Sequence, residues 1–449
     1  MKTIIRQATI VNEQKQFIAD LLIYNGRIEK ISKQIDCPTE QFNEINAEGL
    51  YLLPGMIDDQ VHFRDPGLTH KADIFTESRA AVAGGITSFM DMPNTIPNTL
   101  TQALLEEKYQ LASMKSLANY SFFMGISKDN LDEALRTDTE TVCGITDDGL
   151  YFDNDEGILS NYPEFLEQLF AKSPTLVALH SEDDSIIRKN LIEYKKVYGE
   201  NIEPKHHSEI RSAEACLEST KRVIDIAKKH NNRLHFFHIS TGQEALLFDN
   251  KVAAREKRIT AEACIHHLVF NTTDYEKLGN KIKWNPSIKS SADNEMLIQC
   301  LNDNHLDIVA TDHAPHTWLE KTGDYFQAKS GGPLVQHALI ALLELYHDGK
   351  MSIEKIVEKA SHHVSDIYRL VDRGYIREGY YADLVLVDLN TQQRINQEEL
   401  LYKCGWTPFS DKIFRSKIKK TFINGNLVFD EGKINDNPFG HRLLFEKIR

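Results

Sequence analysis

Histidines and aspartates in this chain recur where predicted strands end. Each follows a short apolar run: His62, the Asp147-Asp148 pair, His180, His238 and Asp312. Imidazole and carboxylate groups together suit Zn²⁺, provided that one position stays open for water. Because the C-terminal ends of barrel strands converge on one face, residues far apart in sequence can meet there. We therefore expect these residues to form one metal-binding constellation.

Single histidines carry much less information. The chain has 18 of them, and most should be surface residues or hydrogen-bonded core residues. We interpret His206-His207 and His266-His267 in this way. The metal hypothesis therefore depends on the coincidence of five strand-end positions.

Alternating strands and helices must hold such residues in place. Between Pro54 and about Arg373, buried-strand runs alternate with longer amphipathic stretches, as in parallel β/α units. The predicted strands are Gly55 to His62, Ile86 to Met92, Thr141 to Asp147, Thr175 to His180, Leu234 to Ile239, Arg258 to Ala263, Ile282 to Asn285 and Asp307 to Asp312. The predicted helices include Ala103 to Met114, Tyr162 to Ala171 and Ser208 to Lys229. The sequence thus predicts an α/β fold with a (β/α)₈ TIM-type barrel over residues 54–374.

The two ends of the chain have a different sequence pattern. Residues 1–53 and 375–449 contain short β-like runs, such as Leu21 to Tyr24 and Ala382 to Asp388, separated by turn residues such as Asn25-Gly26. We predict that both segments together form one small β-sandwich domain.

Composition limits the partners. With 449 residues, 41% hydrophobic and 26% charged, the chain is long enough for a large barrel and a smaller domain. The net charge of -14 argues against a nucleic-acid surface, and Lys417 to Lys420 is interpreted as a solvated edge. An anionic metabolite can still bind where a local arginine or metal supplies positive charge.

The six cysteines are scattered without a CxxC pair, which fits reduced thiols and a cytoplasmic location. The N-terminus lacks a signal-peptide pattern and no apolar stretch reaches membrane-spanning length, so no membrane association is expected. A homodimer is compatible with the sequence, which leaves the oligomeric state open.

Several longer motifs match a known family. The motifs are Asp58-Asp59-Gln60-Val61-His62-Phe63-Arg64-Asp65-Pro66-Gly67, Met92-Pro93-Asn94-Thr95, Thr146-Asp147-Asp148-Gly149, His238-Ile239-Ser240-Thr241, Asn285-Pro286, Ala310-Thr311-Asp312-His313-Ala314-Pro315-His316 and Gly379-Tyr380-Tyr381-Ala382-Asp383-Leu384. In these motifs and in their order the chain resembles the class I dihydroorotases of the amidohydrolase superfamily, essentially from end to end.

The resemblance implies a ligand set for zinc. His180 and His238 would bind one metal, together with a carboxylate of the Asp147-Asp148 pair, where related enzymes use a carbamylated lysine. Asp148 is favoured, although the sequence does not separate the two. An Asp-Asp-Gly string can also form a turn without any metal, and the second carboxylate can support the site by a hydrogen bond.

Gln60 departs from the family pattern. The family's first-strand motif is His-x-His, and here Gln60 stands in place of the first histidine. An amide oxygen binds zinc less well than imidazole does, so the metal position on Gln60, His62 and Asp312 should be weak. One tightly bound zinc per chain is expected.

Substrate contacts are also implied by the resemblance. Arg64, Asn94 and His316 would hold a substrate carboxylate, Asn285 would bind the ring amide, and Ser330 and Gly331 would offer backbone contacts. A guanidinium can grip a carboxylate by two parallel hydrogen bonds, which lysine cannot reproduce. The alternatives are a surface ion pair between Arg64 and Asp65 and a capping role for His316.

The implied activity is that of a dihydroorotase. With zinc activating a water, Asp312 would take the proton and return it to the leaving nitrogen, so dihydroorotate and carbamoyl aspartate interconvert in pyrimidine synthesis. Two alternatives stay open. One is another cyclic amidohydrolase, such as an allantoinase or dihydropyrimidinase. The other is a non-catalytic partner of aspartate transcarbamoylase, for which Gln60 is the only support.

Overall fold

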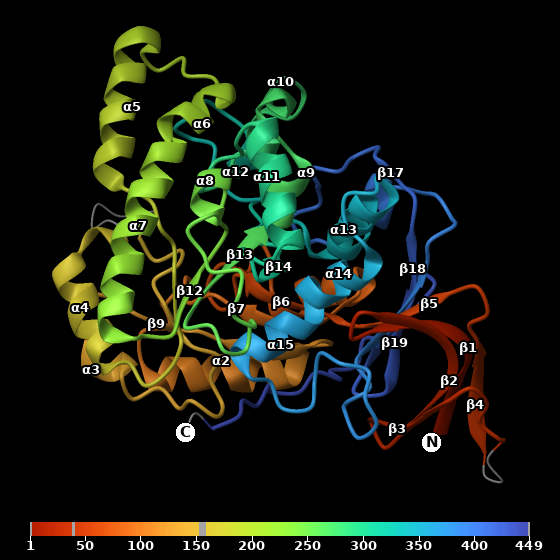
Figure 1. Ribbon diagram of the computed structural model, residues 1–449. Helices are drawn as coiled ribbons and strands as arrows, with labels where there is room; N and C mark the ends of the chain where they lie inside the picture. Colours follow the sequence, from red (N-terminus) through yellow and green to blue (C-terminus); the bar gives the residue numbers. More distant parts are fainter. Residues whose placement is uncertain (1, 38–40, 152–158, 448–449) are drawn as a thin grey trace.

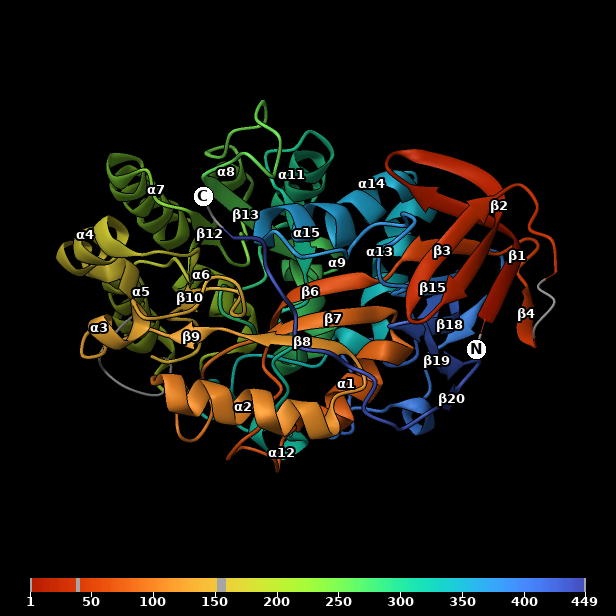
Figure 2. The ribbon, with the colours of Figure 1, turned by 90° about the horizontal axis from the view of Figure 1, so that it is seen from below.

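A computed structural model describes residues 2–37, 41–151 and 159–447. Parallel strands and surrounding helices occupy the middle of the chain, while strands from both ends lie together at one side (Figure 1). Seen from below, β6, β7 and β8 run side by side with helix α2 next to them (Figure 2).

The central parallel strands follow one another in chain order. β6 pairs with β7 and β7 with β8, β9 continues the line after Phe123, and pairing then runs from β9 through β14. His313, just beyond β14, bridges to Val61, and its carbonyl accepts the His62 N–H at 2.8 Å. The last strand therefore meets the first. The bounds are β6 (Met56–Val61), β7 (Ile86–Asp91), β8 (Asn119–Phe122), β9 (Met124–Gly125), β10 (Ile145–Thr146), β11 (Val177–Leu179), β12 (Leu234–Phe236), β13 (Ile259–Cys264) and β14 (Ile308–Ala310).

Helices surround these strands, and local signals explain where several of them begin. The side chains of Asp73, Thr101 and Ser212 each accept a backbone N–H of the first turn. The longer helices are α1 (Ile74–Ala83), α2 (Gln102–Lys115), α4 (Pro163–Lys172), α5 (Asp184–Tyr198), α7 (Ala213–His230), α11 (Ser291–Asn302), α13 (Ala338–His347) and α15 (His363–Tyr368). The shorter ones are α3 (Leu131–Ala134), α6 (His207–Ile210), α8 (Gly242–Ala245), α9 (Ile265–Val269), α10 (Tyr275–Leu278), α12 (Trp318–Lys321) and α14 (Ile353–Val357).

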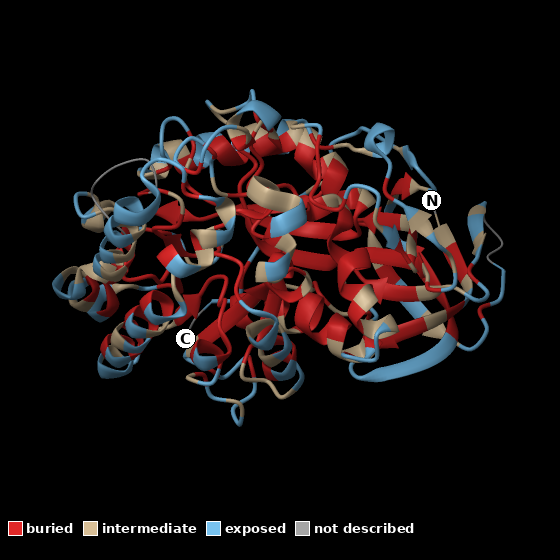
Figure 3. Ribbon diagram, turned by 90° about the horizontal axis from the view of Figure 1, so that it is seen from above, coloured by how far each residue is buried: buried red, intermediate tan, exposed pale blue. Residues whose placement is uncertain are grey.

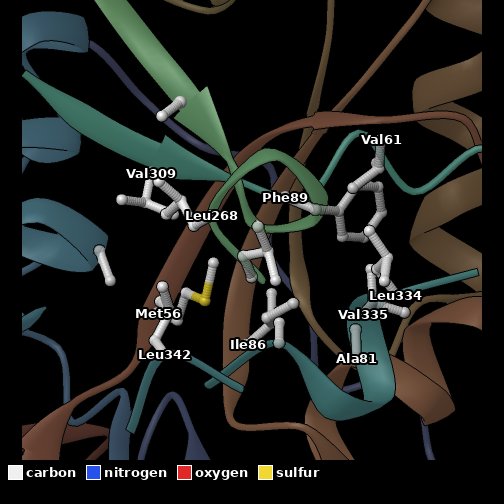
Figure 4. Packing of buried hydrophobic residues seen from close by; sticks show 14 of the residues in the cluster. Met56, Val61, Ala81, Ile86, Phe89, Leu268, Val309, Leu334, Val335 and Leu342 are labelled. Atoms are coloured by element: carbon white, nitrogen blue, oxygen red, sulfur yellow. The ribbon is translucent and has the colours of Figure 1, made fainter. Parts of the chain in front are cut away.

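The apolar core lies between strands and helices. Met56 of β6, Ile86 and Phe89 of β7, and Val309 of β14 pack with Leu342 of α13 in one buried cluster (Figure 4). The strands are buried and the outer helix faces are exposed (Figure 3). Burial on both faces explains why strands such as β11 and β14 are continuous apolar runs.

The two ends of the chain share one mixed sheet, as the sequence predicts. β5 joins them, because it pairs with β1 on one side and β15 on the other. Asn25-Gly26 forms the predicted turn and Asn424-Gly425 forms a second Asn-Gly turn, with positive φ at all four residues. The strands are β1 (Lys2–Asn12), β2 (Lys15–Tyr24), β3 (Arg27–Ser32), β4 (Phe42–Asn46), β5 (Tyr51–Pro54), β15 (Leu384–Asp388), β18 (Lys417–Ile423), β19 (Asn426–Asp430) and β20 (Lys433–Ile434). A separate pair is β16 (Gln393–Arg394) with β17 (Ile413–Phe414).

Three elements differ from the prediction. Ile282 to Asn285 is not a strand: a 3₁₀ turn ends at Ile282, and the Lys283 carbonyl accepts from the loop residue Gly331. β8 was not predicted, because its sequence Asn-Tyr-Ser-Phe lacks an apolar run. The helix expected over Ser208 to Lys229 is divided at Arg211, where Ser212 caps the second part.

Among the described residues, no helix combines the length and the apolar character that crossing a membrane requires.

Candidate active site

A pocket of about 230 Å³ opens at the C-terminal ends of the parallel strands. Loops after β6, β7, β10 and β14 supply its walls, together with the segment before α11 and the loop after α12. Its lining includes most of the residues singled out by sequence: His62, Arg64, Asn94, Asp148, Asn285, Asp312, His316, Ser330 and Gly331. His180 and His238 lie buried next to this lining, in contact with Asp148.

Asp148, His180 and His238 form a compact triangle, here called the pocket triangle. His180 Nδ1 lies 3.0 Å from His238 Nε2, and Asp148 Oδ1 is 3.7 Å and 3.8 Å from these two nitrogens. All three side chains are buried, and their ligand atoms lie close enough together to hold one metal ion. Two imidazoles and a carboxylate are a donor set that suits zinc.

A buried carboxylate orients His180. Glu182 Oε2 lies 2.7 Å from His180 Nε2, and Arg211 forms an ion pair with the same carboxylate. The Arg211 charge and the His180 contact outweigh burial and hold the pKa of Glu182 well below its usual range. Because Glu182 accepts the Nε2 proton, Nδ1 of His180 faces the pocket triangle. Sequence reasoning missed Glu182, although it stands only two residues after His180.

The charges around the pocket triangle favour a cation. Burial would raise the pKa of Asp148, but hydrogen bonds from His180 and His238 hold it well below its usual range. Burial would lower the pKa of His180, but Asp148 and Glu182 raise it to about 9, so near neutral pH Nδ1 carries a proton that a metal ion would displace. The residues present therefore fit a positive ion at this point, in agreement with the donor set.

The structure brings Asp148, rather than Asp147, to the pocket triangle. Asp147 turns away, and its Oδ2 accepts the Leu159 N–H at 2.9 Å. Gly149 follows with φ of 74°, and a Cβ there would come within 2.4 Å of the Asn94 amide nitrogen. The glycine of the Asp-Asp-Gly string thus lets Asn94 approach.

His62 and Asp312 lie beside the same carboxylate. His62 Nε2 is 3.1 Å from Asp312 Oδ1 and 3.4 Å from Asp148 Oδ2. The other ring nitrogen, Nδ1, lies 2.8 Å from Asn94 Oδ1. An amide oxygen and a carboxylate oxygen both only accept, so Nδ1 donates to Asn94 and Nε2 donates to Asp312, and a metal ion at this point would replace the Nε2 proton.

Both ends of the Gln60 side-chain amide form hydrogen bonds within the protein. Its Nε2 donates to Asp148 Oδ2 at 3.2 Å, and its Oε1 accepts from the Cys264 thiol at 3.3 Å. The amide oxygen that could bind a metal is thus used by Cys264. This arrangement agrees with a weak second metal position.

Arg64 and His316 also line the pocket, and Lys71 lies next to His316. Arg64 Nε donates to the Pro315 carbonyl at 3.3 Å, and Lys71 Nζ lies 3.2 Å from His316 Nδ1. Burial and the charges of Arg64 and Lys71 hold the pKa of His316 well below its usual range. Neutral His316 therefore accepts from Lys71 and donates its Nε2 proton to the Ser330 carbonyl at 3.0 Å.

The two alternatives considered for these residues are wrong. Asp65 pairs with Lys115 at 2.8 Å instead of Arg64. The residue that caps α12 is Thr317, whose side chain accepts from Glu320 N.

The side chain of Asn285 contacts His207, which the sequence analysis interprets as a surface or core histidine. His207 Nε2 lies 2.7 Å from the Trp284 carbonyl and 3.1 Å from Asn285 Oδ1, while Tyr325 Oη lies 2.8 Å from His207 Nδ1. Nε2 must carry the proton because it faces acceptors, so the tyrosine hydroxyl donates to Nδ1. The Asn285 oxygen is thus occupied, and its NH₂ group remains for the pocket. No sequence signal distinguishes His207 from His206.

Backbone strain gathers at this site. Arg64, His238 and Asp312 have φ of 65°, 38° and 47°, in the left-handed region that non-glycine residues seldom adopt. Such conformations cost free energy and cluster where side chains must be aimed precisely at a ligand.

Comparison with known proteins agrees with this fold and pocket. The amidohydrolase family model matches residues 51–428. A dihydroorotase from Methanosphaera stadtmanae is 32% identical over 422 residues, covering 93% of this chain and 94% of the relative. An allantoinase from Desulfitobacterium hafniense is 30% identical over 451 residues, covering 98% of both chains. Among solved structures, an L-hydantoinase from Arthrobacter aurescens superposes with a TM-score of 0.91 at 22% identity, covering 98% of this chain and 99% of that one.

The fold and its solved neighbours define a hydrolase with a TIM barrel and an additional domain. More particularly, the chain belongs to the amidohydrolase family, and its relatives assign it to the cyclic amidohydrolases.

Proposed function

We propose that the protein is a dihydroorotase, which hydrolyses the cyclic amide of dihydroorotate reversibly to carbamoyl aspartate in pyrimidine synthesis. The observation that carries the proposal is that Arg64 lines the same pocket as Asp148 of the pocket triangle. A site that combines metal-ligand groups with a guanidinium suits a ring amide that bears a carboxylate. The similarity to dihydroorotases supports the same substrate.

The proposed architecture is a (β/α)₈ barrel over residues 54–374 with a β-sandwich from residues 1–53 and 375–449. The bridge between Val61 and His313 supports closure of the barrel. The shared sheet of both chain ends supports the second domain.

Asp148, His180 and His238 would hold one zinc ion. When bound, zinc supplies a Lewis acid for the ring carbonyl and lowers the pKa of a water to near neutrality. Glu182 and Arg211 keep His180 in the correct tautomer for this task. His62 and Gln60 would offer at most a weak second position.

Asp312 is the proposed base. Its Oδ1 lies 3.1 Å from His62 Nε2, at the edge of the pocket, where it can take a proton from an attacking water. The same carboxyl group would then deliver the proton to the leaving ring nitrogen. By microscopic reversibility, Asp312 serves ring closure by the same path in the opposite direction.

The substrate carboxylate would lie against Arg64, Asn94 and His316, and His316 would turn its Nε2 proton from the Ser330 carbonyl to this carboxylate. Asn94 Oδ1 is occupied by His62, so its NH₂ group is the part directed at an anion. Asn285 would donate to a ring carbonyl, since His207 holds its oxygen. Ser330 and Gly331 would close this side of the pocket through backbone groups.

An allantoinase is the second candidate, because a relative with that name matches at 30% identity over almost the whole chain. The ring of allantoin lacks the carboxylate that Arg64 would bind. A non-catalytic partner of aspartate transcarbamoylase is a third candidate that only Gln60 supports.

A substrate panel separates these candidates. The purified protein, supplied with zinc, is assayed with dihydroorotate, dihydrouracil and allantoin, and Asp312→Asn serves as the inactive control. We expect ring opening of dihydroorotate to exceed that of the other two rings. Preference for allantoin would replace the proposal, and no turnover of any ring by fully zinc-loaded protein would favour the non-catalytic candidate.

A further inference from the structure

A second cluster of metal-ligand side chains lies inside the ring of strands. Asp59 of β6, His235 of β12 and Glu262 of β13 bring their ligand atoms within 4.8 Å of one another. We call this set the interior triangle. Its residues precede His62, His238 and Cys264 on the same strands, so the interior triangle lies closer to the N-terminal strand ends than the pocket does. All three side chains have 0% exposure.

The interior triangle has the size of a metal site. His235 Nε2 lies 3.2 Å from Glu262 Oε2 and 3.5 Å from Asp59 Oδ2. Ligands that bind tetrahedral zinc at about 2.0–2.2 Å lie roughly 3.3–3.6 Å from one another. The pocket triangle, with edges of 3.0 to 3.8 Å, is no better matched to that geometry.

The two carboxylates have no positive partner. Neither Asp59 nor Glu262 forms an ion pair with lysine or arginine among the described residues. Two carboxylates in a dry interior are costly unless a cation or shared protons compensate them.

The hydrogen bonds around the interior triangle are compatible with a cation, which would take the place of the proton shared by His235 and Glu262. Asp59 Oδ1 is completely buried and has no hydrogen-bond partner within the part of the chain that the structure describes. The Thr260 hydroxyl donates to the Leu234 carbonyl at 3.4 Å, so its oxygen accepts from His235 Nδ1 at 2.8 Å. The lone pair of His235 Nε2 then faces both carboxylates, which is the arrangement of a metal ligand.

We propose that Asp59, His235 and Glu262 bind a second divalent metal ion, zinc or one of similar chemistry, separate from the ion of the pocket triangle. Tyr368 completes the surroundings, because its hydroxyl donates to Asp59 Oδ2 at 2.8 Å.

The ion would be structural and would support the pocket from beneath. Glu262 Oε1 accepts the backbone N–H of His238 at 3.1 Å and lies 3.4 Å from the Cys264 thiol. A metal on Glu262 Oε2 would fix this carboxylate, and with it the strained backbone of His238. The proposal needs no assumption about the substrate.

Anomalous diffraction locates the ion directly. Crystals of the full chain, stripped by a chelator and then supplied with Zn²⁺ alone, are measured on both sides of the zinc absorption edge. We expect one peak at Asp148, His180 and His238 and a second peak at Asp59, His235 and Glu262. A zinc peak at the pocket triangle with none at the interior triangle would overturn the proposal and leave the proposed dihydroorotase intact.

Metal counting by elemental analysis provides the second test. His235→Asn should lose about one zinc per chain, while the matched control Tyr368→Phe, which keeps all three ligands, should lose none. Unchanged zinc content in a folded His235→Asn protein would overturn the proposal. If that variant does not fold, the diffraction experiment on the unmodified chain still decides.

Discussion

The pocket triangle and the interior triangle use similar donors in different surroundings. Asp148, His180 and His238 stand at the edge of a pocket that also contains Arg64. The interior triangle lies beside the apolar barrel residues Phe237 and Tyr368, which contact the His235 ring. Donor type and spacing alone therefore predict where a metal can bind, whereas access to a substrate group decides where a metal can catalyse.

His180→Ala should have the largest effect and should break the pocket triangle alone. Loss of this ligand removes the Lewis acid, which is worth several kcal/mol, so kcat should fall by roughly 10³-fold or more. Zinc content should fall by about one ion per chain. Near-normal turnover with full zinc content would eliminate the proposed ligand set.

The matched change in the other region is His235→Asn. It should also lower the zinc content, yet turnover should fall far less than in His180→Ala, because no substrate group reaches the interior. Equal losses of kcat in the two variants would contradict the distinction between a catalytic and a structural ion.

Asp312→Asn should separate base chemistry from metal binding. A general base contributes about 10²–10⁴-fold, so kcat should fall by that factor in both reaction directions. Zinc in the pocket triangle should stay bound, since Asp312 is not one of its three residues. Stopped or initial-rate assays of ring opening and ring closure measure the effect, and loss in only one direction would remove Asp312 from the role of base.

His207→Gln tests a residue that positions Asn285, and we expect a smaller effect than in the variants above. Freeing the Asn285 oxygen removes about one neutral hydrogen bond, worth about 1 kcal/mol, so KM for dihydroorotate should rise about fivefold. Tyr325→Phe should produce a smaller rise in the same constant, because it acts only through His207. A change in kcat with an unaltered KM would show that His207 has another role.

Gln60→His should have the smallest effect on rate. It restores an imidazole donor beside His62 and Asp312, so the variant should bind about one more zinc ion per chain than the unmodified protein does. Activity should persist in both proteins, because one ion can perform both metal tasks. A zinc already bound at Gln60 and His62 in the unmodified protein, located by anomalous diffraction, would refute the weak-site prediction.

The comparison also marks the limits of sequence reasoning. His62, Asp148, His180 and Asp312 could be placed together because apolar runs mark strands and strand ends converge. His207 could not be identified, because it acts through a tertiary contact that no spacing encodes. Glu182 stands only two residues after His180 and was missed, because that spacing alone does not show that its carboxylate turns toward the ring. The interior triangle escaped for the same reason as His207.

The secondary structure also divides into elements that local sequence predicts and elements that tertiary contacts decide. The Asn-Gly turns and the main parallel strands follow local rules, and the structure contains them. Ile282 to Asn285 looks like a strand, but its backbone is tied to the loop at Gly331 and no ladder forms there. A local sequence pattern predicts a strand correctly only where a neighbouring strand can pair with it.

The ratio of kcat/KM for dihydroorotate to that for dihydrouracil, measured in the unmodified protein and in Arg64→Lys, tests the central claim most directly. The two rings differ by the carboxylate, and Arg64 is the residue placed to bind it. The account predicts a strong preference for dihydroorotate that falls about 10- to 100-fold in Arg64→Lys, since a charged, paired hydrogen bond is lost. Zinc content should not change. A preference for dihydrouracil, or a ratio that Arg64→Lys leaves unaltered, would contradict the claim that this pocket selects a ring by its carboxylate.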